Sequence, residues 1–196
     1  MKIDFEKAID RIGHPEQGRE RFREILEDVF NLMISLARES ERASVILAVA
    51  RIDSDLEKLL QHVLHPKQGN GDSLFDSERP LSAFSAKITM ARRLGVIDRE
   101  FESALQILRR IRNEFAHEIE ASTLSSDRNR DRLADLVKLF ENTDLYKSGL
   151  ALGVGKRHEN TAEQEQMLVC VACIVADLVI STSSMRRVYV GHPLKP

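Results

Sequence analysis

Apolar residues recur at three- and four-residue steps along most of this chain, which is the spacing of one buried face of an α-helix. One such stripe lies between Arg19 and Glu39, and a second lies between Ala43 and His65. Pro66 ends the second stripe, because a proline inside a helix removes a backbone hydrogen bond. No alternating pattern of apolar and polar residues long enough for a β-strand is present. The pattern therefore predicts an all-α fold.

Glycine, proline and aspartate mark the ends of two further predicted helices. Residues 66–80 are rich in Gly, Pro, Asp and Ser, a composition typical of loops. Pro80 suits the first turn of a third helix, where a missing amide hydrogen costs no hydrogen bond, and Gly95 suits the left-handed residue that closes it. Asp98 suits the cap of a fourth helix, whose C-terminal half is the sequence RRIRNEFAHE, residues 109–118.

The last third of the chain predicts two more helices joined by a connector. An apolar stripe from Leu133 to Phe140 indicates a fifth helix. Three glycines beside charged residues favour a flexible connector over residues 143–161. Thr161 and Gln164 have the spacing of a capping box ahead of an apolar helix, Met167 to Ile180. The expected architecture is thus a bundle of about six helices.

Length and composition favour one globular domain over residues 1–196, with an N-terminal extension (1–17) and a C-terminal tail (185–196). The formal net charge of -2 argues against a strongly basic nucleic-acid binder. The start of the chain lacks the pattern of a signal peptide, so we expect a cytoplasmic protein without membrane association. The apolar run 167–180 is shorter than the roughly 20 residues of a membrane span and contains Asp177, so it predicts a core helix.

Three short patterns that resemble reactive or binding motifs lack the context those motifs need. Cys170 and Cys173 form a C-x-x-C inside an apolar helix, where small buried core residues are the expected role. The sequence LGVGKRH, residues 152–158, lacks the glycine and hydroxyl positions of a phosphate-binding loop. His62 and His65 lie three residues apart without a third metal ligand. We expect no metal and no cofactor.

The end of the fourth predicted helix carries a concentration of basic side chains. Cations near a helix C-terminus meet its partial negative charge, so Arg109, Arg110, Arg112 and His117 suit a structural role there. A functional role is the alternative. Asn113 and His117 lie only about 40° apart around the helix, whereas Arg112 and His117 lie about 140° apart. Bringing Arg112 and His117 together requires a flexible arginine, a frayed last turn or a second copy of the helix.

The segment between residues 43 and 118 resembles the mannitol operon repressor (MltR) family. The matching pieces are an apolar helix, a Gly-rich loop, the runs PLS and AKI before LGVI, and a following helix that ends in Arg112 and His117. This resemblance implies an MltR-like bundle and a cytoplasmic regulator of sugar-alcohol uptake genes. No helix pair with an evident basic DNA-reading helix is present, so we predict that repression works through a protein partner.

The sequence RNEFAH resembles the signature of HEPN domains, which are helical bundles that commonly form homodimers. In nuclease members the arginine, the following polar residue and the histidine act on RNA without a metal. Carried over, Arg112, Asn113 and His117 are the candidate catalytic residues of a ribonuclease, as an alternative to the regulator. Arg109 and Arg110 supply the cations that RNA binding needs, and we expect Arg92 and Arg93 to lie nearby.

Overall fold

The computed structural model describes residues 19–66, 73–117, 123–189 and 191, and in this part of the chain every regular element is a helix. The elements are α2 (Arg19–Ala37), α3 (Glu41–Val63), the 3₁₀ turn η2 (Ser73–Phe75), α4 (Phe84–Arg93), α5 (Arg99–His117), α6 (Asp127–Phe140), α7 (Asp144–Leu152), α8 (Val154–Arg157) and α9 (Ala162–Ser184). The predicted all-α bundle is confirmed. Residues 1–17 of the expected N-terminal extension lie outside the described residues.

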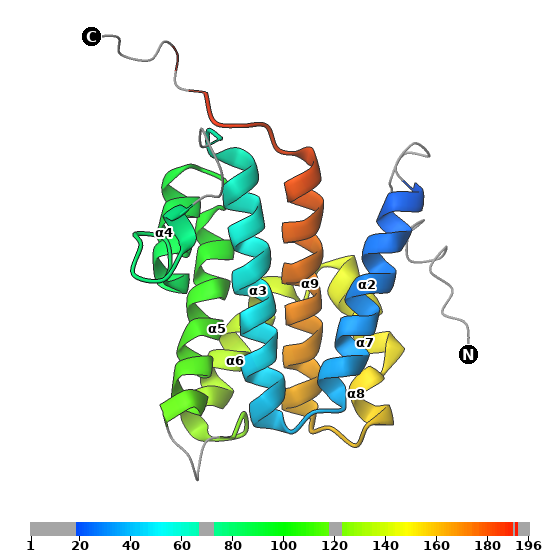
Figure 1. Ribbon diagram of the computed structural model, residues 1–196. Helices are drawn as coiled ribbons and strands as arrows, with labels where there is room; N and C mark the ends of the chain where they lie inside the picture. The colour runs from blue at the N-terminus through cyan, green and yellow to red at the C-terminus, as the bar shows by residue number, and fades with distance from the viewer. Residues whose placement is uncertain (1–18, 67–72, 118–122, 190, 192–196) are drawn as a thin grey trace.

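Helix α9 is the central helix of the bundle (Figure 1). It packs against α2, α3, α6, α7 and α8, and its residues from Met167 to Ala176 are all buried. By length and composition α9 is apolar enough to cross a membrane, yet 61% of its most apolar window is buried inside the bundle. A helix that is apolar on every side is what a central position requires. The predicted core helix is confirmed.

The two cysteines of α9 belong to this core. Both are free and buried. Burial raises the pKa of the Cys170 thiol well above its usual range, and burial together with the neighbouring Asp177 carboxylate raises the pKa of Cys173 to about 12. A protonated, buried thiol is a poor nucleophile and a poor metal ligand. The prediction that these residues fill the core is confirmed.

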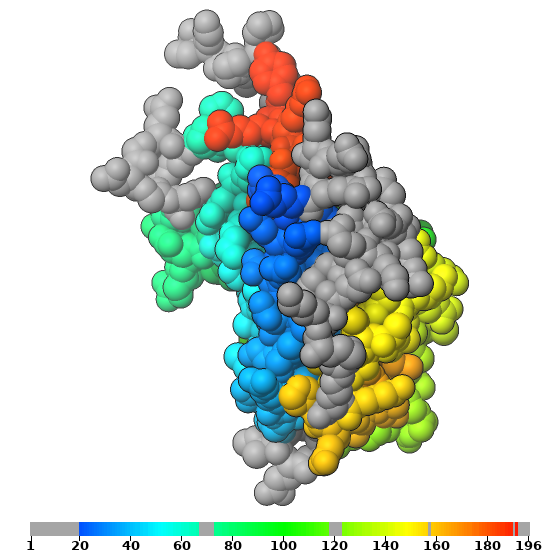
Figure 2. Space-filling view, turned by 90° about the vertical axis from the view of Figure 1, so that its right-hand side faces the viewer, coloured from blue at the N-terminus to red at the C-terminus, as the bar shows by residue number. Residues whose placement is uncertain are grey.

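Helix α2 runs along the outside of the bundle beside α3 and α8 (Figure 2). On the opposite side of α3 lie α4 and α5, which also pack against each other. Lys87 of α4 is almost fully buried between these helices, and its ammonium group lies 2.8 Å from Asp53 Oδ1 and 2.7 Å from Glu57 Oε2 of α3. These two ion pairs join α4 to α3 across an otherwise apolar contact.

The prediction of a flexible connector over residues 143–161 is wrong, because helices α7 and α8 occupy most of it. Thr143 caps α7 through its hydroxyl, and Gly153, with a φ of 58°, supplies the left-handed turn that separates the two helices. Gly149 is buried against α9, where a Cβ atom would lie only 2.8 Å from Val169 Cγ1. The glycines in this segment permit close packing and a sharp turn.

The prediction that Pro80 opens the third helix is also wrong, since α4 begins at Phe84. The amide of Leu81 donates a hydrogen bond to the carbonyl of Leu74, 3.1 Å away, and the Leu81 side chain is buried. This contact holds the residues after Pro80 in a turn against η2, so the helix cannot start there. The predicted end of the same helix is confirmed, because Gly95 has a φ of 72°.

Candidate functional site

The C-terminal end of α5 lies beside the N-terminal end of α3, at the lower end of the bundle in Figure 1. Arg42 of α3 donates a hydrogen bond to the carbonyl of Phe115, one of the carbonyls that the end of a helix leaves unpaired. The Leu124 amide, just beyond α5, donates to the Glu41 carboxylate. The Arg42 contact anchors the last turn of α5, and the described part of the helix is regular through His117. Within the described residues the last turn of α5 is therefore helical and not frayed.

The buried stripe of α5 decides which of its side chains reach solvent. Ile111 and Phe115 have no exposed surface and fix the orientation of the last two turns. Arg112 and His117 are exposed, and Asn113 is half-buried between the two faces. The strong separation of apolar and polar residues along α5 therefore places all three candidate catalytic residues outside the core.

Arg112 and Asn113 are joined directly. The Nη1 atom of Arg112 donates a hydrogen bond to Asn113 Oδ1 at 3.1 Å. The arginine therefore bends around the helix toward the face that Asn113 shares with His117, one turn further on. Among the described residues no hydrogen bond links His117 to either of the other two. Flexibility of the arginine thus brings two of the three predicted residues together and leaves His117 adjacent on the same face.

The remaining basic side chains of this helix end lie on the surface as well. Arg110 is exposed, and Arg109 is half-buried, with its Nε atom donating to Gln106 Oε1 at 2.8 Å. The one acidic residue within the sequence RNEFAH, Glu114, is mostly buried and forms ion pairs with Arg128 and Arg132 of α6. Four basic residues have no carboxylate partner in the described part of the chain: Arg109, Arg110, Arg112 and His117. We call these four residues the α5 basic end.

The expectation that Arg92 and Arg93 lie near this cluster is wrong. The Nε atom of Arg92 lies 3.6 Å from Glu102 Oε2, near the start of α5. Glu102 precedes Arg112 by ten residues, which is about 15 Å along a helix that rises 1.5 Å per residue. The two arginines therefore belong to the opposite end of α5 and add nothing to the α5 basic end.

His62 and His65 lie at the C-terminal end of α3, away from the end of α5. His62 Nε2 lies 3.0 Å from the carbonyl oxygen of Met185, in the extended segment after α9, and His65 is exposed. Within the described residues, no group of three or more histidine, cysteine, aspartate or glutamate side chains has the geometry to hold a metal ion.

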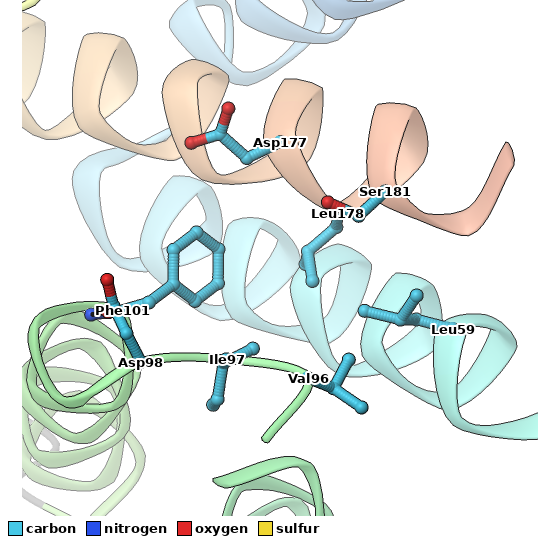
Figure 3. A pocket seen from close by; sticks show the side chains of 8 residues that line it. All are labelled: Leu59, Val96, Ile97, Asp98, Phe101, Asp177, Leu178 and Ser181. Carbon is cyan, nitrogen blue, oxygen red and sulfur yellow. Dashed lines mark hydrogen bonds between the residues drawn. The ribbon is translucent and has the colours of Figure 1, made fainter. Parts of the chain in front are cut away.

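A small pocket of 230 Å³ lies between α9, α3 and the loop that joins α4 to α5 (Figure 3). Leu178 points from α9 toward this loop, and Asp98 in the loop caps α5 by accepting from the Phe101 amide at 2.8 Å, as predicted. Burial raises the pKa of Asp177, on the rim, to about 6, although the residue keeps exposed surface. The only sign of this pocket in the sequence is the single charged residue, Asp177, in the apolar run 167–180.

Comparison of the chain with protein-family models, with curated proteins and with solved structures gives no match. The geometry of the α5 basic end and the resemblances in the sequence are therefore the features that indicate a function.

Proposed function

We propose that this chain is a cytoplasmic regulatory protein, similar in role to mannitol operon repressors, that forms a homodimer and acts by binding a protein partner. The observation that carries the proposal is the α5 basic end, a group of three arginines and a histidine at the surface with no carboxylate partner among the described residues. Exposed charges of one sign steer association with a surface of opposite charge and help to select the partner. The surface that fits is therefore an acidic one.

The helix pair α4 and α5 supports a protein partner over DNA. A short glycine-containing turn connects these two helices, which is the arrangement of DNA-binding helix-turn-helix motifs. In those motifs the first turns of the second helix enter the major groove. Here the first turn of α5 carries Arg99 beside Glu100 and Glu102, and Glu102 is paired with Arg92, so acidic and basic side chains offset each other where phosphates would require an excess of positive charge. Specific, salt-sensitive binding of the purified protein to operator DNA, measured by fluorescence anisotropy, would refute this part of the proposal.

Charge removal tests the role of the α5 basic end. The test variant replaces Arg109, Arg110 and Arg112 with glutamine, which keeps the side chains polar while removing three positive charges. The matched control makes the same replacement at three exposed cations of other helices: Arg93, Lys138 and Lys147.

The readout is the transcript level of sugar-alcohol uptake genes in a deletion strain complemented with each variant. We expect the wild type and the control to restore repression and the test variant to fail, with equal helical content by circular dichroism. Full repression by the test variant contradicts the proposal. Sedimentation equilibrium tests the homodimer separately, and a monomer at all accessible concentrations rejects that element.

A second candidate function, a metal-independent ribonuclease, is favoured by the hydrogen bond between Arg112 and Asn113. An arginine held on the face of His117 can bind a phosphate through its fork of donors and stabilise the charge that develops on it. The histidine can move a proton to or from a ribose hydroxyl or a leaving oxygen. In a homodimer, two such faces could meet and close the groove that a single helix end leaves open.

The ribonuclease assay uses varied single-stranded RNAs with a chelator present. If this function holds, cleavage persists in the chelator and disappears in His117→Ala, whereas His65→Ala, at another exposed helix end, cleaves like the wild type. Intact RNA after incubation with the wild-type dimer excludes this function while leaving the regulatory role open.

A further inference from the structure

A larger pocket lies far from the α5 basic end, between α2, α3 and α9. Its volume is 540 Å³, within the range of small-molecule sites. Its lining residues come from the first turn of α2, the C-terminal half of α3 and the end of α9, segments that lie at the upper end of the bundle in Figure 1. His62 in its wall follows Arg42, the α3 residue that contacts the end of α5, by 20 residues, or about 30 Å of helix. The two sites are therefore separate.

A buried carboxylate organises the pocket. Asp55 is only 3% exposed, and its two oxygens accept hydrogen bonds from Arg51 Nε at 2.6 Å and from Lys58 Nζ at 2.9 Å. A carboxylate this deeply buried requires such partners. Through these bonds Asp55 positions the charged groups of Arg51 and Lys58 beside the pocket. Arg51 is engaged through Nε, and its two Nη groups are additional donors.

The pocket carries more positive than negative charge. Arg21 extends into it from the first turn of α2, and it has no carboxylate partner among the described residues. With Arg51 and Lys58 it makes three cations around the single carboxylate of Asp55. The imidazole of His62 lines the same wall. An anion with close to two negative charges balances this arrangement, and a phosphate monoester carries about 1.5 to 2 at pH 7.

The wall from α9 has a different chemistry. The Thr182 hydroxyl donates to the Leu178 carbonyl at 2.8 Å, and the Ser183 hydroxyl donates to the Ile180 carbonyl at 2.7 Å. Because their hydrogens are directed into the helix, the two oxygens act as acceptors toward the pocket. Acceptors of this kind pair with ligand hydroxyl groups.

We propose that this pocket binds a small phosphate monoester whose carbon skeleton carries hydroxyl groups. The phosphate lies against Arg21, Arg51 and Lys58, and the hydroxyls donate to the α9 side chains. The charge balance favours a phosphate over a carboxylate, which has one negative charge and fewer acceptor oxygens. This site is independent of the regulatory and ribonuclease roles proposed for the α5 basic end.

Isothermal titration calorimetry of the full chain at low ionic strength tests the proposal, with glycerol 3-phosphate as the probe. We expect saturable binding at one site per chain, weaker binding of inorganic phosphate and no binding of glycerol. Arg21→Gln should weaken binding about tenfold or more, because it removes one of three cations. Lys58→Gln should act similarly, with Arg51 still bonded to Asp55 so that the fold is retained.

Arg93→Gln is the matched control, since it removes one exposed cation outside the pocket. Equal affinity of this control and the wild type supports the proposal. Three results overturn it: no saturation by glycerol 3-phosphate at millimolar concentration, equal weakening by Arg21→Gln and Arg93→Gln, or equal affinity for inorganic phosphate and glycerol 3-phosphate. The last result removes the role assigned to the α9 oxygens.

Discussion

The buried ammonium group of Lys87 allows a quantitative test of how α4 is attached to α3. Its side chain is 5% exposed, whereas its partners Asp53 and Glu57 keep 30% and 31% of their side-chain surface in water. Burial alone would lower the pKa of Lys87, but the hydrogen bonds and charges of the two carboxylates outweigh burial and raise it. The lysine is therefore charged in the folded protein and depends on both partners.

The perturbation is the double substitution Asp53→Asn and Glu57→Gln, which keeps the shapes and removes both negative charges. Leaving a fully buried charge without a partner costs about 3–5 kcal/mol of unfolding free energy. Because water reaches the two partners, we expect a loss of about 2–4 kcal/mol at pH 7. Each single substitution leaves one carboxylate and should cost less than about 1 kcal/mol, so the double loss should exceed the sum.

Urea unfolding followed by circular dichroism measures these losses without the added salt that would screen the charges. Adding Lys87→Met to the double variant should restore most of the stability, because it removes the uncompensated ammonium while filling the same space. At alkaline pH the lysine loses its proton, so the ion pairs stabilise the protein less as the pH rises. Their contribution is complete below the usual lysine pKa of about 10.4 and is lost as the pH rises through the higher folded value. A double variant as stable as the wild type, or no rescue by Lys87→Met, refutes this account.

Three further predictions concern the core and the small pocket. Gly155→Ala should destabilise the protein by about 1–3 kcal/mol in the same urea assay, because the new Cβ would lie 2.7 Å from Glu165 Cβ. Cys170 and Cys173, buried with raised pKa values, should resist iodoacetamide in native protein and react after denaturation, as mass spectrometry can show. Asp177, whose pKa is raised to about 6, binds its proton more tightly in the folded state, so its contribution should lower the stability as the pH rises from 4 to 6. Asp177→Asn should remove that contribution, which solvent screening of this exposed residue keeps below about 1 kcal/mol.

Features that depend on residues close together in the chain could be predicted from the sequence. The apolar stripes predicted α2, α3, α5 and α6, because a helix that buries one face repeats its apolar residues every three or four positions, and this spacing is visible in the sequence. Gly95 and Asp98 marked a helix end and a helix start through backbone geometry and a local hydrogen bond. In the candidate site, helical spacing alone placed Asn113 and His117 on one face.

Features that depend on contacts between distant segments follow from the tertiary structure and could not be predicted from the sequence. The segment after Thr143 has the composition of a loop, yet it is helical because its small residues allow close packing against α9. Pro80 has the local chemistry of a helix start, but the contact from Leu81 to η2 places that start later. The pocket around Asp55 combines side chains from α2, α3 and α9, and the spacing of these residues in the sequence does not predict that they lie together. Local preferences are worth tenths of a kcal/mol per residue, whereas packing and buried ion pairs are worth about 1 kcal/mol or more, so they prevail where they conflict.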